Sequence, residues 1–266
     1  MKPAARKILG YQLRDIARNR WVIAYAIVLA ILTEALFRLG GAGAGDRVVL
    51  SLLNVVLIIV PLVALTFGIL YLYNAREFIE LLLAQPVGRK AMFAGLWGGV
   101  ALPLAGALLV GVGIPFLFRV GSGPLAAGAL FILLGTGVLL TTVFTALAFL
   151  IGLSFEDRTA GFGVAMVVWL FCAVVYDGLV LLTVAIFNDY PLETPLLVLT
   201  MLNPLDLGRI LLLLRLDTAA LLGYTGAVFQ RFLGTTLGQG MALGALVTWV
   251  AVPLALGVRR FGRRDF

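Results

Sequence analysis

Two carboxyl groups stand out among the residues that could carry chemistry, because both lie within long apolar runs. Glu34 is followed four residues later by Arg38, so the two side chains share a helical face and predict a local ion pair. Asp177 lies near the middle of another run, with no basic residue one turn away. An unpaired charge inside a membrane is costly, so Asp177 is either protonated or paired with Arg209 or Arg215. A structural ion pair is one interpretation of Asp177, and a role in a translocation path or in subunit coupling is the other.

The sequence lacks the residues that most enzyme and metal sites need. It contains no His, which argues against a Ser–His dyad, an HExxH zinc site and most imidazole metal sites. Aspartyl chemistry needs two carboxylates that share a proton, and no second acid lies deep in a run beside Asp177. No GxxxxGK[ST] phosphate loop is present. We therefore expect no catalytic residue, no metal site and no cofactor bound by this chain.

The most informative polar stretch lies at residues 73–90, between two apolar runs. A short helix is predicted over about 75–84, and Pro86 with Gly88 ends it. An exposed helix that is both apolar and charged fits a protein partner, and the alternative is a linker helix resting on the membrane surface. Its acids and its apolar residues occupy neighbouring faces: Glu77, Glu80, Phe78, Leu81 and Leu82.

A second segment, 188–236, is apolar in places but interrupted by polar residues. Asn203 and Pro204 are typical of a helix start, with Asn as the cap, Pro at the first position and Asp206 near the positive end of the helix dipole. A spanning helix would have to bury these three residues together with Arg209. We therefore expect two short re-entrant helices that dip into the outer leaflet or lie on it.

Membrane-spanning helices have to position all of these residues. Of 266 residues, 62% are hydrophobic and 12% are charged, whereas a soluble domain carries roughly 25% charged residues. A span needs about 20 apolar residues. We predict an all-α integral membrane protein with one transmembrane domain over 1–266 and six spans, at about 21–39, 48–73, 91–118, 125–155, 162–187 and 237–258.

The basic residues predict the orientation of these spans. With both termini in the cytoplasm, 14 of the 20 Lys and Arg residues lie on the inner side, as expected for a multi-pass protein of the cell inner membrane. The net charge of +7 is explained by these boundary positions, so we expect no nucleic-acid partner. Residues 4–20 have one apolar and one basic face, which predicts an amphipathic helix on the cytoplasmic surface; an ordinary basic tail is the alternative.

With these segments the sequence resembles the permease subunits of type-2 ABC exporters. Within that group it is most similar to the permeases of systems that mature nitrous-oxide reductase, which are associated with multicopper enzyme maturation. Many members carry an acidic-Gly-Thr run where Arg76, Glu77, Phe78 and Ile79 stand here. The matching pieces are the leucine run with Pro86 and Arg89, the stretch 168–182 with Tyr176 and Asp177, residues 202–209, and the basic tail 261–264.

The resemblance implies the transmembrane half of an ATP-driven exporter that does no bond chemistry itself. ATP and Mg would be held by separate cytoplasmic ATPase subunits. Two copies of the chain would pair in membrane lipid as a homodimer, or this copy would pair with a relative. Residues 203–209 would form an outer gate or meet an extracytoplasmic accessory protein. The segment between the second and third spans would be the coupling helix that docks on the ATPase, through Arg76, Glu77, Phe78, Glu80, Leu81, Leu82, Pro86 and Arg89.

Other functions stay open from the sequence. A proton- or ion-coupled secondary transporter that uses Asp177 is the main alternative, although no internal repeat supports it. An intramembrane enzyme and a purely structural assembly factor are further alternatives. Nothing in the spans identifies a transported substrate, and the link to copper enzymes rests on the resemblance alone.

Overall fold

The computed structural model describes residues 10, 16, 19–40, 45–83, 88–120, 124–187, 193–215 and 235–263. The secondary structure of these residues is helical, as predicted for an all-α membrane protein. The helices are α2 (Arg20–Gly40), α3 (Gly45–Asn74), α4 (Arg76–Leu83), α5 (Arg89–Val120), α6 (Pro124–Ser154), α7 (Arg158–Leu170), the π-helix η1 (Phe171–Val175), α8 (Tyr176–Ile186), α9 (Glu193–Met201), α10 (Pro204–Arg215) and α12 (Thr236–Arg263).

Six candidate spans among the described residues fall on the six predicted runs. The last span continues to Arg263, beyond the expected end at 258. The predicted surface helix over 4–20 lies mostly outside the described residues. The spans are Arg20–Leu39, Val48–Asn74, Arg89–Arg119, Leu130–Ser154, Arg158–Ile186 and Gly238–Arg263.

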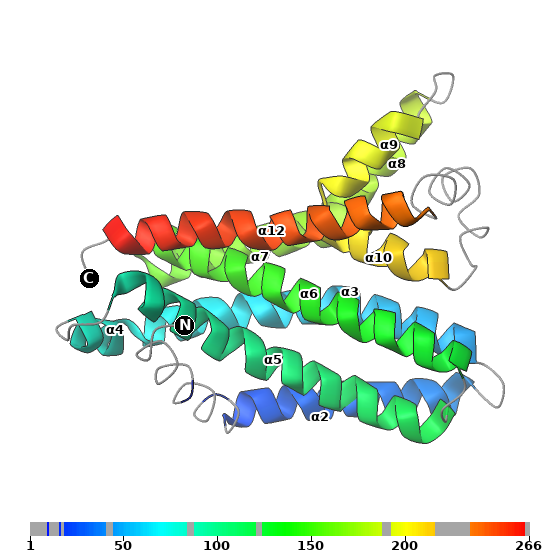
Figure 1. Cartoon of the computed structure of the whole chain (residues 1–266), viewed down its shortest axis with the longest axis horizontal. Helices are drawn as coiled ribbons and strands as arrows, with labels where there is room; N and C mark the ends of the chain where they lie inside the picture. Colours follow the sequence, from blue (N-terminus) through cyan, green and yellow to red (C-terminus); the bar gives the residue numbers. More distant parts are fainter. Residues whose placement is uncertain are drawn as a thin grey trace.

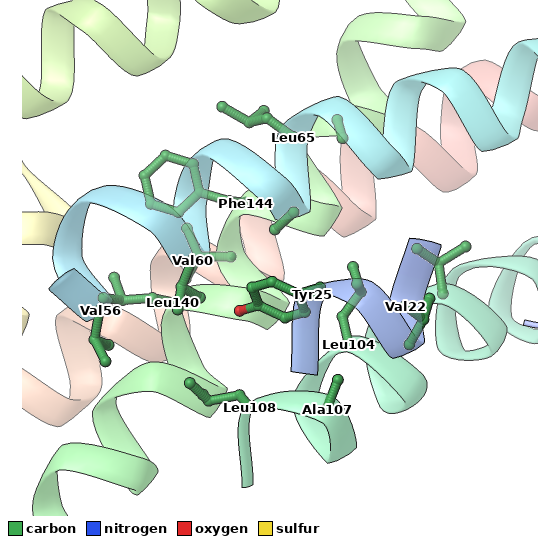
Figure 2. Packing of buried hydrophobic residues seen from close by; sticks show 14 of the residues in the cluster. Val22, Tyr25, Val56, Val60, Leu65, Leu104, Ala107, Leu108, Leu140 and Phe144 are labelled. Atoms are coloured by element: carbon green, nitrogen blue, oxygen red, sulfur yellow. The ribbon is translucent and has the colours of Figure 1, made fainter. Parts of the chain in front are cut away.

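Three spans form the centre of the bundle. In the apolar stretches of α3, α5 and α6, 56%, 61% and 56% of the residues are buried, against 22% in α2 and 22% in α12. Figure 2 shows side chains from α2, α3, α5 and α6 meeting in this core. Buried hydroxyls are satisfied within their own helix, since Thr141 donates to the Gly137 carbonyl at 2.8 Å and Thr145 to the Thr141 carbonyl at 2.6 Å. The hydroxyl protons of these two threonines are therefore used within their own helix.

The fifth span is helical over Arg158–Ile186, as expected over 162–187, but one turn in its middle is a π-helix, so that α7 passes through η1 into α8. Of the apolar stretch of this span, 11% is buried. In Figure 1, α8 and α9 extend away from the bundle, whereas α10 runs along it. Helix α10 packs on α3, α6 and α12, and Gly208 makes that approach close, because a methyl group there would lie 2.8 Å from Thr136 Cγ2.

Two short helices follow α8, as the sequence predicted. The pair Pro195–Met201 and Pro204–Leu213 is bent by 111° at the break between them. Asn203 stands at this break, and the Leu207 amide donates to its carbonyl at 3.1 Å while the Leu205 amide donates to its side-chain Oδ1 at 3.1 Å. The predicted cap is therefore formed, because Asn203 satisfies amides of the first turn of α10.

Candidate coupling helix and outer polar cluster

Helix α4 follows α3 after a single turn residue. The Ala75 amide donates to the Tyr71 carbonyl at 2.9 Å, and the Ile79 amide donates to the Ala75 carbonyl at 2.8 Å, so the chain changes direction without leaving helical hydrogen bonding. Ile79 is fully buried and fixes one face of α4 on the bundle. The opposite face is free, because Glu77 and Glu80 are exposed and Leu81 is 70% exposed.

Two side chains tie this turn to the loop between α6 and α7. The Tyr73 hydroxyl lies 3.0 Å from the Phe155 carbonyl and 3.2 Å from the Asp157 carbonyl, and it donates to this pair. The Arg76 guanidinium donates to the Glu156 carbonyl at 2.8 Å and lies over the Tyr73 ring, 4.6 Å from its centroid. Arg76 is therefore turned inward, toward the loop rather than toward the exposed face of α4.

The start of α7 is fixed in the same place. The Asp157 carboxylate accepts from the Thr159 amide at 3.2 Å and from the Ala160 amide at 2.9 Å, which caps the helix. Gly161 is buried, and a methyl group there would overlap the Tyr73 hydroxyl. The end of α3, the start of α4 and the start of α7 are thus held as one unit by hydrogen bonds and close packing.

The beginning of α5 and the end of α12 close this side of the bundle. Arg89 donates through Nη1 to the Gly262 carbonyl at 2.9 Å, and Arg260 bonds the Ser154 hydroxyl. Phe261 is buried, with its ring centroid 5.7 Å from that of Phe93. Arg89, like Arg76, thus contacts the chain itself.

The remaining residues predicted for coupling differ in exposure, and two of them are not fully described. Phe78 is half-buried, while Glu77, Glu80 and Leu81 face outward. The side chain of Leu82 and the whole of Pro86 lie outside the described part of the chain.

A polar cluster joins α8, which carries Asp177, to α10, which carries Asp206 and Arg209. The Asp177 carboxylate lies 2.9 Å from Arg209 Nη1, which confirms Arg209 as one of its two predicted partners. The same Nη1 is 3.5 Å from Asp206 Oδ1, and Asn203 donates through Nδ2 to Asp206 Oδ2 at 3.2 Å. One guanidinium therefore serves two carboxylates at the point where α8, α10 and the break before α10 meet.

The π-helix supplies an acceptor to this cluster. In a π-helix the regular pattern of α-helical hydrogen bonds is changed locally. Asn203 donates through Nδ2 to the Cys172 carbonyl in η1 at 2.9 Å. Two carbonyls at the end of α9 accept from side chains, and that of Leu199 also accepts from the Leu202 amide at 3.0 Å. Tyr176 donates to the Leu199 carbonyl at 2.5 Å, and Trp249 of α12 donates through Nε1 to the Met201 carbonyl at 3.1 Å.

The second intramembrane acid has two cationic partners. Arg38 Nε lies 2.9 Å from Glu34 Oε1, which confirms the predicted local pair. Arg119, from the end of α5, also pairs with this carboxylate, so Glu34 joins the ends of α2 and α5. The sequence did not predict Arg119, because it lies 85 residues away and becomes a neighbour only when the two helices pack together.

Comparisons with known proteins agree over nearly the whole length. A protein-family model described as "ABC-2 family transporter protein" matches residues 6–266. A curated relative from Pseudomonas aeruginosa, named "Probable ABC transporter permease protein NosY", is 30% identical over 277 residues, covering 98% of this chain and 99% of the relative. A relative of the same name from Stutzerimonas stutzeri is 29% identical over 270 residues, covering 95% of this chain and 96% of the relative.

Proposed function

The chain belongs to the ABC-2 family of transporter proteins, and on that premise we propose that it is the permease subunit of an exporter that serves the maturation of a copper enzyme. It is a multi-pass membrane protein and a transmembrane permease of an ABC transporter, whose ATPase partners lie in the cytoplasm. The direction of transport and the copper link are the proposed steps. The copper link is supported by the resemblance to permeases of nitrous-oxide-reductase maturation systems.

The observation that carries this proposal is the position of α4. Its outer face presents Glu77, Glu80 and Leu81, while Ile79, Tyr73 and Arg76 hold it to the bundle. A helix of this kind suits docking into a groove on an ATPase, with the acids giving charge complementarity at the rim. Arg76 acts in this proposal by positioning α4, and Phe78 supplies apolar contact at its edge.

Force on α4 would reach the spans through rigid contacts. A displacement of the α3–α4 turn would carry the 155–157 loop with it, because Tyr73 and Arg76 bond the carbonyls of that loop. Asp157 and Gly161 would pass the movement to α7. ATP-driven closure of two ATPase subunits would then tilt α7 in each permease copy and switch the access of the pathway between the two sides, a rigid-body transition.

Two copies of the chain, each with one ATPase, would form the transporter. Both termini would lie in the cytoplasm, so that α4 faces the ATPase and the break at Asn203 lies toward the outer side. The cluster of Asn203, Asp206, Arg209 and Asp177 would then gate the outer end or meet an extracytoplasmic accessory protein. Pro204 supports this role by fixing the direction in which α10 starts.

The test is purification of the tagged chain in mild detergent, with mass spectrometry of the proteins that accompany it. We expect a stoichiometric ATPase with a phosphate loop, which is lost when Glu77→Lys and Glu80→Lys are combined. The control is Glu156→Lys, which reverses an exposed acid on the neighbouring loop. Recovery of the chain alone, with ion flux in liposomes that depends on Asp177, would contradict the proposal and support a secondary transporter.

A further inference from the structure

A groove of about 1110 Å³ runs along α3 between α2 and α7. One face of α3 forms its floor, with residues three and four apart from Ile59 to Asn74. At 1.5 Å per residue this floor is roughly 22 Å long, somewhat more than half of a bilayer core about 30 Å thick. Val28 of α2 lies at the edge of the groove and is 47% exposed. The groove therefore opens on the side of the bundle that faces the lipid.

The two ends of the groove differ in polarity. Val28, Ile59 and Leu62 line the far end, whereas Asn19, Asn74 and Arg158 line the end beside α4. An amphiphile that lies along α3 would therefore place its apolar part toward the middle of the bilayer and its polar part beside α4.

Arg158 gives the polar end a positive charge. Its side chain is exposed, and among the described residues it has no carboxylate partner and no hydrogen bond. Nearby, Trp21 lines the groove and is 65% exposed, with Arg20 5.8 Å from its ring centroid. Exposed Trp and Arg at one level of a helical bundle are typical of the headgroup region of a membrane.

We propose that this groove binds one anionic phospholipid of the cytoplasmic leaflet, with its phosphate at Arg158 and an acyl chain along α3. The charge at Arg158 and the apolar floor fit the two parts of such a lipid, and the cytoplasmic leaflet carries the anionic lipids. The assignment of leaflet rests on the orientation given under the proposed function. A lipid between α2 and α7 contacts α7, whose start is fixed to the turn between α3 and α4. Such a lipid would therefore affect the movement of α7.

The test is photocrosslinking of the full-length protein in vesicles of phosphatidylethanolamine and phosphatidylglycerol. Phe67, on the groove floor, is replaced by p-benzoylphenylalanine, and adducts are identified by intact mass. We expect adducts of single phospholipids in which phosphatidylglycerol is enriched roughly fivefold over its share of the vesicle, the size of effect that one cation gives near a membrane surface.

Two charge variants decide where that preference comes from. Arg158→Gln should bring the phosphatidylglycerol adduct down to its share of the vesicle while the phosphatidylethanolamine adduct remains, which shows that the groove is intact. Arg259→Gln is the matched control, since it removes an exposed arginine on the same side and outside the groove; the enrichment should persist.

Two outcomes would overturn the proposal. One is an adduct at twice the mass of the chain, which would mean that a second copy fills the groove. The other is a wild-type ratio of lipid adducts equal to that of the vesicle. Failure of the transporter proposal is read separately, from the ATPase that accompanies the chain, because lipid enrichment should be unchanged in the Glu77→Lys and Glu80→Lys variant.

Discussion

Arg209 is the residue on which the polar cluster between α8 and α10 depends, because its guanidinium is the cation shared by Asp177 and Asp206. Removing the carboxylate of Asp177 leaves Arg209 paired with Asp206. Removing Arg209 leaves two acids close together with no cation between them. The side chains of Arg209 and Asp177 are 32% and 35% exposed, so water lowers the cost of each change below that of a fully buried pair.

A double-mutant cycle on this pair should therefore be asymmetric. We expect Arg209→Gln to lower the free energy of unfolding by about 2 to 3 kcal/mol and Asp177→Asn by about 1 kcal/mol. The double variant should cost less than the sum, with a coupling of about 1 kcal/mol. Reversible unfolding in mixed micelles measures all three, with Arg259→Gln as the control. Additive losses would contradict a structural pair and leave Asp177 free for another role.

Gly161 allows a second test at the scale of single residues. A methyl group at Gly161 would overlap the Tyr73 hydroxyl, whereas a methyl group at Gly163 meets nothing within 4 Å. We expect Gly161→Ala to destabilise the protein by about 1 to 3 kcal/mol, because Tyr73 has to leave the 155–157 carbonyls. Gly163→Ala on the same helix should be neutral or slightly stabilising. Thermal unfolding of the two purified variants compares them directly.

The same variants also test transmission from α4. Gly161→Ala should lower the extent to which the permease raises the rate of ATP hydrolysis in the assembled transporter. The amount of bound ATPase should be unchanged, since the exposed face of α4 is untouched. Loss of the ATPase from purified Gly161→Ala, with Gly163→Ala normal, would show instead that this contact shapes the docking surface itself.

At the scale of single residues, the sequence could predict that an acid requires a cation more easily than it could predict which cation. The charge of Asp177 inside an apolar run required a cation, but Arg209 and Arg215 were equal candidates until the fold brought α10 beside η1. Glu34 and Arg38 could be paired from their spacing. Tyr73 had no such indication, because its acceptors are backbone carbonyls more than 80 residues away.

At the scale of elements, two local departures from the regular α-helix lie beside each other. The fifth span passes through the π-helix η1, and the segment after it is bent between α9 and α10. Asn203 connects them, since its amide group bonds the Cys172 carbonyl while its Oδ1 accepts from the Leu205 amide. The cap of α10 was predictable from Asn203, Pro204 and Asp206, whereas the π-helix was not, because no Pro or Gly pair marks it in the sequence.

Asn203→Ala should therefore weaken both elements together. It removes a helix cap and leaves the Cys172 carbonyl without that donor, and we expect a loss of about 2 kcal/mol in the free energy of unfolding. Hydrogen exchange should also rise at the amides of both η1 and the first turn of α10. Asn54→Ala, at an exposed position of α3, is the control. Faster exchange in α10 alone would mean that the hydrogen bond from Asn203 to η1 does not stabilise η1.

At the scale of the whole molecule, burial is uneven. The apolar stretches of α3, α5 and α6 are 56% to 61% buried, and that of α7 to α8 is 11% buried. The six spans could be predicted because apolar length alone defines them. The outward course of α8 and α9 in Figure 1 could not, because it depends on the π-helical turn and on the bend after α9 rather than on hydropathy.

Hydrogen exchange in nanodiscs should follow this distribution. We expect the slowest amides in α3, α5 and α6 and faster exchange in α8 and α9, since segments with few buried contacts open at lower free energy. Uniform protection of α8 and α9 in the permease alone would contradict this ranking. Protection that appears only with a second copy or an accessory protein would locate their contact on these helices.

The end of α12 has a practical consequence for anyone shortening the chain. By hydropathy the last span stops near 258, and the arginines beyond it look like a removable tail. The side chain of Phe261, however, belongs to the interior: it packs beside Phe93, whose ring in turn meets Phe149 edge-on at 5.8 Å. A deletion after Val258 would expose an aromatic surface of two other helices to solvent, so poor expression of such a truncated protein would report a damaged core and not the loss of a positive charge.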